Sequence, residues 1–144
     1  MKYTIMFLIG GLIYGALEII VKGDTHFSMF VVGGICFTLI GALSKNMSLI
    51  SRMLSGAVII TALEFISGVI VNIWLKENVW DYSHLPLNIM GQVCLLFTII
   101  WFFLSLPGIL LCGYLDWRLF GESKPYYRIA PRIRERVKNN RAAG

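Results

Sequence analysis

The sequence predicts an all-α membrane protein with four transmembrane helices and a basic cytoplasmic tail. Of its 144 residues, 57% are hydrophobic and 15% are charged, whereas a soluble domain averages about 25% charged residues. Apolar segments close to the length of a bilayer crossing recur along the chain. Lipid cannot satisfy open backbone groups, and the segments lack the alternation of barrel strands, so helices are expected. We place a four-helix transmembrane domain at residues 1–112 and a basic tail at 113–144.

The expected spans cover residues 3–21, 28–43, 54–75 and 88–112. A bilayer core about 30 Å thick requires about 20 mostly apolar residues in a helix, so the second span is short. The first and third spans each contain one acid, Glu18 and Glu64. A cleaved signal peptide is an alternative for the first span. A signal peptide begins with a positively charged region, and here Lys2 is the only basic residue before the apolar segment. Glu18 also interrupts the region where cleavage would occur.

The distribution of positive residues predicts the orientation of the chain in the membrane. Eleven of the 13 lysines and arginines fall on the side of the two termini, and only Lys22 and Lys76 fall on the other. Cytoplasmic loops carry the excess of positive charge, so we expect a multi-pass protein of the cytoplasmic membrane with both termini inside.

The tail is the most basic part of the sequence. Its arginines are expected to contact anionic lipid headgroups, at about 1 kcal/mol for each cation near the surface. These are Arg128, Arg132, Arg134 and Arg136. Docking to a cytoplasmic partner or to nucleic acid is an alternative for the same residues. No motif of aromatic and basic residues typical of RNA binding is present, and no nucleic acid is expected.

The first and third spans contain an internal repeat. Residues 10–20 (GGLIYGALEII) align without a gap with residues 56–66 (GAVIITALEFI), and six positions are identical, including Glu18 and Glu64. Both copies run in the same direction, so the repeat predicts two helical hairpins related by an axis along the membrane normal. A duplication is one interpretation, and chance identity between apolar segments is the other.

The two intramembrane acids are the principal candidates for a functional site. An acid at the centre of a membrane costs about 2.5–3.5 kcal/mol on insertion scales, and is tolerated when it faces a partner or water. Either the carboxyls bind an ion, proton or substrate, or they are hydrogen-bonded packing groups. Packing partners for them would be Tyr14, Thr61, Asn72 or an indole N–H. Gly11 and Gly15 lie on the face of Glu18 and would let another helix approach closely.

A second polar cluster lies between the third and fourth spans. Asn88 is expected to cap the fourth span, with Gln92 one turn further on. We expect a loop that folds back over the bundle and covers a cavity in the outer half of the membrane. An interfacial turn whose aromatic residues only set the depth of the helices is the alternative. The candidate binding residues are Glu18, Glu64, Asn72, Asp81, Tyr82, Asn88 and Gln92.

No cofactor or metal ion is expected. The three cysteines, Cys36, Cys94 and Cys112, are not at metal-ligand spacing, and His84 has no paired ligand nearby in the sequence.

The chain resembles the ABC-transporter type IV (CmpB-like) family of bacterial multi-span membrane proteins. The resemblance covers residues 10–105. It rests on Glu18 with Lys22-Gly23, Met29 with Gly33-Gly34, Glu64-Phe65 with Gly68 and Asn72, and Trp80-Asp81-Tyr82-Ser83 with Pro86, Asn88, Gly91, Gln92 and Trp101. It implies a bacterial inner-membrane protein of the permease type. The family usually has an arginine where this chain has Lys22. A lysine cannot make the bidentate contact to an anion that an arginine makes, so such a contact is not expected there.

A transporter or permease-type subunit, with Glu18 and Glu64 lining a polar cavity, is therefore the leading functional hypothesis. The sequence has no phosphate-binding ATPase motif, and four spans are few for a transport path. Such a subunit would form a homo-oligomer or join a separate ATPase or membrane subunit. One alternative is a scaffold or assembly factor without a site. Another is a membrane-embedded enzyme that uses its carboxyls as acid and base on a lipid-like substrate.

Overall fold

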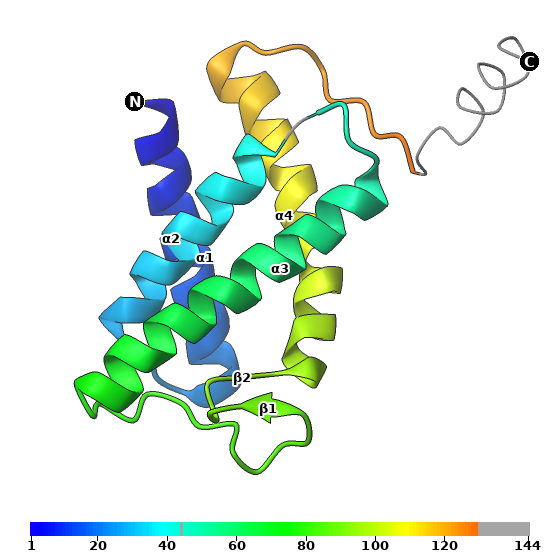
Figure 1. The fold of residues 1–144 in the computed structure, drawn as a ribbon. Helices are drawn as coiled ribbons and strands as arrows, with labels where there is room; N and C mark the ends of the chain where they lie inside the picture. The colour runs from blue at the N-terminus through cyan, green and yellow to red at the C-terminus, as the bar shows by residue number, and fades with distance from the viewer. Residues whose placement is uncertain (44, 130–144) are drawn as a thin grey trace, which may run out of the picture.

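A computed structural model describes residues 1–43 and 45–129, which form a bundle of helices with a small hairpin at one end (Figure 1). The elements in chain order are α1 (Lys2–Lys22), α2 (Phe27–Ala42), α3 (Leu49–Gly68), η1 (Val69–Trp74), β1 (Asn88–Ile89), β2 (Val93–Cys94) and α4 (Leu95–Phe120). The expected all-α class is confirmed. Three helical stretches, Lys2–Lys22, Leu49–Trp74 and Leu95–Phe120, are long and apolar enough to cross a membrane, and α2 is a shorter apolar helix.

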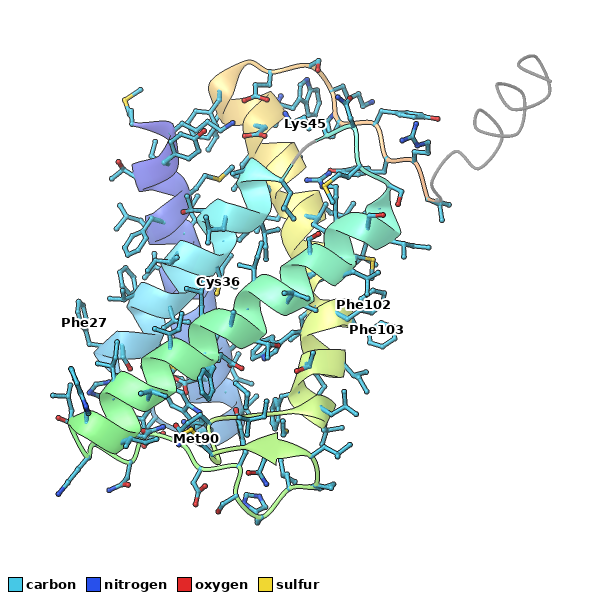
Figure 2. The ribbon with its side chains drawn as sticks, in the orientation of Figure 1. Phe27, Cys36, Lys45, Met90, Phe102 and Phe103 are labelled. Carbon is cyan, nitrogen blue, oxygen red and sulfur yellow. The ribbon has the colours of Figure 1, made fainter. Side chains whose placement is uncertain are left out.

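The bundle has two ends, which we name by their contents. The hairpin end carries the turn between α1 and α2, and the segment from η1 to β2. The terminal end carries Met1, the connector between α2 and α3, and the chain beyond α4 (Figure 1). The exterior between the two ends is apolar: Leu12, Val58 and Phe103 are each more than 60% exposed, and Figure 2 shows Phe103 pointing away from the bundle. Lipid covers such a surface in a membrane protein.

The first two helices pack closely because glycines remove side chains from their interface. A Cβ atom on Gly11 would lie 2.7 Å from the Phe30 ring of α2, and a Cβ atom on Gly34 would lie 2.6 Å from the Phe7 ring of α1. The close approach expected at Gly11 is therefore confirmed. Gly15 does not take part, since a Cβ atom there would meet only the Thr25 hydroxyl at 3.8 Å.

The two copies of the sequence repeat occupy comparable places. Gly10 of α1 lies against Phe37 of α2, and its counterpart Gly56 of α3 lies against Ser105 of α4, with no room for a Cβ atom at either position. The chain thus pairs α1 with α2 and α3 with α4. This pairing agrees with the two helical hairpins that the repeat predicts.

The centre of the bundle is a small apolar core contributed by α2, α3 and α4. Its buried members are Val32, Cys36, Ile40, Met53, Ile60 and Ile109. Figure 2 shows Cys36 between the helices. All three cysteines are buried and free.

The fourth helix differs from the expected span at both ends. It begins at Leu95, after the short hairpin, and continues through Cys112 to Phe120. The predicted N-cap at Asn88 is wrong, because the Asn88 side chain organises the hairpin. Its amide donates to the Leu85 carbonyl at 2.7 Å, and its carbonyl oxygen accepts from the Gly91 N–H at 3.0 Å. Gly91, at φ +67°, makes the turn between the two strands.

Candidate functional site

Glu64 is a buried carboxyl in the middle of the Leu49–Trp74 span, and it is 3% exposed. The Tyr14 hydroxyl of α1 donates to its Oε1 at 2.9 Å, and the Trp101 indole N–H of α4 donates to its Oε2 at 2.7 Å. The two rings stack with their centroids 5.8 Å apart. Glu64 therefore joins three helices at one point.

Two of the partners expected for the acids are confirmed, namely Tyr14 and an indole. Thr61 instead donates to Thr98 of α4 at 3.1 Å. A carboxylate offers about four lone-pair positions, and two of those on Glu64 are occupied by the described donors. The two described donors therefore leave about two lone-pair positions on the group.

Glu18 has a different environment at the hairpin end of α1. Lys22 lies one turn away and pairs with its Oε1 at 2.9 Å, while the Thr25 hydroxyl donates to its Oε2 at 2.7 Å. The Lys22 ammonium also donates to the Val79 carbonyl at 3.1 Å, which ties the loop after η1 to α1.

Asn72 and Gln92 fasten the loop between η1 and β2 to the bundle. The Asn72 amide donates to the Gln92 side-chain oxygen at 2.8 Å and to the Trp80 carbonyl at 3.0 Å, and its oxygen accepts from the Val79 N–H at 2.7 Å. The Trp80 indole donates to the Gln92 carbonyl at 2.9 Å. Gly68 lets Gln92 approach α3, since a Cβ atom there would lie 2.5 Å from Gln92 Oε1. Asn72 and Gln92 are both buried.

The loop itself is conformationally strained. Lys76, Leu87 and Met90 have φ values of 59°, 54° and 53°, a region that residues with a Cβ atom rarely adopt. Such conformations persist where surrounding contacts hold them, and they gather at sites that clamp or switch. The Asn72 and Gln92 hydrogen bonds provide contacts of this kind.

Two of the remaining candidates, Asp81 and Tyr82, belong to the same loop. Asp81 is exposed, and the hydrogen bond from the Ser83 N–H lowers the pKa of its carboxyl. Tyr82 stacks on Phe97 of α4 at 4.5 Å. Burial, followed by the negative charge of Glu64, raises the pKa of the Tyr82 phenol. Asp81 and Asn88 shape the loop, whereas Tyr82 packs on α4.

A cavity of about 310 Å³ lies beside the Tyr14–Trp101 pair, and its lining is apolar. Tyr14 and Trp101 line it, and neither Glu18 nor Glu64 is among the lining residues. The cavity expected from the sequence was a polar one in the outer half of the membrane, lined by the acids and covered by the loop, and this apolar cavity differs from it. In the part of the chain that the structure describes, no three His, Cys, Asp or Glu side chains are grouped so that they could hold a metal ion.

A second charged cluster, at the terminal end, was not anticipated. Asp116 of α4 is 2% exposed and lies between two lysines, 2.7 Å from Lys2 and 3.1 Å from Lys45. Glu122 contacts the same two lysines, whose ammonium groups lower the pKa of its carboxyl. Figure 2 shows Lys45 at this end. The cluster joins α1, α4 and the connector between α2 and α3.

Together these features define an integral membrane protein with a buried carboxyl and a fastened loop at one end of its bundle. The chain belongs to the family described as "Putative ABC-transporter type IV", whose family model matches residues 2–117. The resemblance noted in the sequence is therefore confirmed. No curated protein and no solved structure shows significant similarity to the chain.

Proposed function

We propose that the chain is the membrane subunit of a transporter and that Glu64 is its ligand-binding group. The observation that carries this proposal is the position of Glu64, buried in the middle of a span with no cationic partner among the described residues. Glu18, in contrast, is paired with Lys22. Unpaired acids within a membrane span are costly, and they commonly mark ion or substrate pathways.

The other candidate residues have supporting roles in this proposal. Tyr14 and Trp101 hold the carboxylate in place, and Tyr82 covers it from the hairpin end. Asn72 and Gln92 keep the loop closed, and release of their hydrogen bonds would open the way to Glu64. Glu18 is the second acid of the path. Strain in the loop lowers the cost of that opening.

A scaffold protein without a ligand is the second candidate function. One observation favours it: both oxygens of Glu64 already accept hydrogen bonds from within the bundle. In that case the carboxyl is a polar contact that sets the packing of α1, α3 and α4. The two functions differ in whether the charge of Glu64 is needed after the bundle has formed.

Cells that lack the chain distinguish the two functions. Transport predicts that such cells accumulate at least one dye from a panel of fluorescent cationic, neutral and anionic amphiphiles differently from wild-type cells. A plasmid copy of the chain should restore the wild-type level. A scaffold predicts unchanged accumulation of every dye and reduced amounts of another membrane protein, a result that would reject the transport proposal.

We further propose that both termini are cytoplasmic and that the hairpin end faces outward. Cysteines introduced at Thr25 and Ser83 should then react with an impermeant thiol reagent in intact cells. A cysteine at Asn46 should react only after the membrane is opened. The three native cysteines are buried, so they add little background. Reaction of the Asn46 variant in intact cells would reverse the orientation.

The terminal end is our proposed contact surface for a separate ATPase subunit or a second copy of the chain. It carries the Lys2–Asp116–Lys45 cluster and the segment after α4. Arg128 donates to the Asn46 carbonyl at 2.8 Å, which holds that segment beside the start of α3. Contact with anionic headgroups stays a proposal for Arg128. Arg132, Arg134 and Arg136 lie outside the described residues.

A further inference from the structure

The apolar cavity beside Glu64 is elongated along the helices. Its lining runs from Trp101 to Leu111 on α4 and from Gly10 to Leu17 on α1. At 1.5 Å per residue these stretches correspond to about 10–15 Å. Phe37 of α2 and Ile60 of α3 contribute to the same lining. This shape and lining suit an extended alkyl chain better than a compact polar solute.

The cavity is open at the side of the bundle. Helix α1 packs chiefly on α2, and α4 packs chiefly on α3. The cavity lies between α1 and α4, beside the Tyr14–Trp101 stack. Ile13 and Leu17 on one wall and Leu104 on the other are each about 40% exposed (39%, 44% and 41%). These residues belong to helices that are long and apolar enough to span the membrane. The opening therefore faces the acyl chains of the bilayer, where an apolar molecule dissolves.

The end of the cavity at Trp101 lies next to a buried carboxyl. Tyr14 and Trp101 are lining residues, and the polar atoms of both side chains donate to Glu64, which is not itself a lining residue. Glu64 has no cationic partner in the part of the chain that the structure describes, since the lysine nearest the acids pairs with Glu18. A buried charge is normally paired, so a ligand that supplies the missing cation complements this end.

We propose that the cavity binds the alkyl chain of a cationic amphiphile, which reaches it sideways from the bilayer and places its ammonium head beside Glu64. This inference rests on the proposed function and names the substrate class of the same site. The apolar walls bind the chain, and the carboxylate selects the charge of the head.

The test compares the binding of dodecylammonium and dodecanoate to the purified full chain in lipid nanodiscs. These two probes have alkyl chains of the same kind and heads of opposite charge. Gly108→Phe fills the cavity, because a Cβ atom at Gly108, which lines it, meets no atom within 4 Å. Leu110→Phe is the matched control, since Leu110 is exposed on the same helix and does not line the cavity.

The wild-type chain is expected to bind dodecylammonium about tenfold or more tightly than dodecanoate, a difference of about 1.4 kcal/mol. Gly108→Phe should weaken dodecylammonium binding by a similar factor, and Leu110→Phe should leave it unchanged. Glu64→Gln should remove the preference for the cation. Thermal unfolding of each variant checks that the fold is retained.

Two results would overturn the inference. If Gly108→Phe is folded and binds dodecylammonium as tightly as the wild type, the cavity is not the binding site. If both probes bind equally to the wild type, the cavity accepts alkyl chains without selecting their charge. Neither result contradicts the proposed function, which fails if cells without the chain accumulate every dye normally or if the charge of Glu64 is dispensable for transport.

Discussion

Gly34→Leu is expected to separate α1 from α2 and to prevent most of the chain from folding. A Cβ atom at this position would lie 2.6 Å from the Phe7 ring and 2.7 Å from the Phe7 carbonyl oxygen. The ring can turn aside, but the backbone oxygen cannot move without shifting the whole of α1. Overpacking of a well-packed core costs about 1–3 kcal/mol and sometimes more, and a clash with backbone belongs to the upper part of that range.

The measurement is the thermal unfolding of the purified chain in detergent, together with the fraction that elutes as a single species. Gly108→Leu is the matched control, because a Cβ atom there meets nothing within 4 Å. We expect the control to unfold near the wild-type temperature and Gly34→Leu to aggregate or to unfold well below it. Equal unfolding temperatures for the two variants would show that α1 and α2 do not need this close contact.

The sequence was sufficient to predict the helical class because hydrophobic length alone identifies helices that cross a membrane. The partners of Glu64 could also be anticipated in kind. A buried carboxyl needs hydrogen-bond donors, and Tyr14 and the indole of Trp101 are available on neighbouring spans. The close approach at Gly11 was readable from the spacing of small residues.

The hairpin between η1 and α4 was not predictable from the pattern of the sequence. Residues 88–94 are apolar enough to continue a helix, and Asn88 is a common N-cap residue. The turn at Gly91 and the Asn72–Gln92 pair decide against the helix there, and that pair joins residues of two separate segments. The secondary-structure propensity of residues 88–94 cannot predict a contact with a residue about 20 positions earlier in the chain.

The ionic cluster at the terminal end escaped prediction for a related reason. Lys2, Lys45 and Asp116 are far apart in the sequence, and only the packing of α1, α4 and the connector between α2 and α3 brings them together. The positive-inside rule counts such lysines to predict orientation, and it does not predict the acids with which they pair. The apolar cavity was missed because it arises from the spacing between packed helices, which no single segment encodes.

Glu64→Gln is expected to abolish transport while the bundle remains folded. Glutamine has nearly the size of glutamate, and its carbonyl oxygen still accepts a hydrogen bond from Tyr14 or Trp101. It cannot carry the negative charge that a cationic ligand requires. Removal of an ionisable group also lowers the cost of membrane insertion, so stability should hold or rise. Glu77→Gln, at an exposed position of the loop, is the matched control.

The most direct measurement is the initial rate of transport of the dye whose accumulation depends on the chain, in cells whose only copy carries Glu64→Gln. The rate is divided by the amount of folded chain in the same membranes, as measured by its elution as a single species. We predict wild-type rates for Glu77→Gln and a rate for Glu64→Gln equal to that of cells without the chain. A wild-type rate for folded Glu64→Gln would contradict the account, because Glu64 would then be a packing group only.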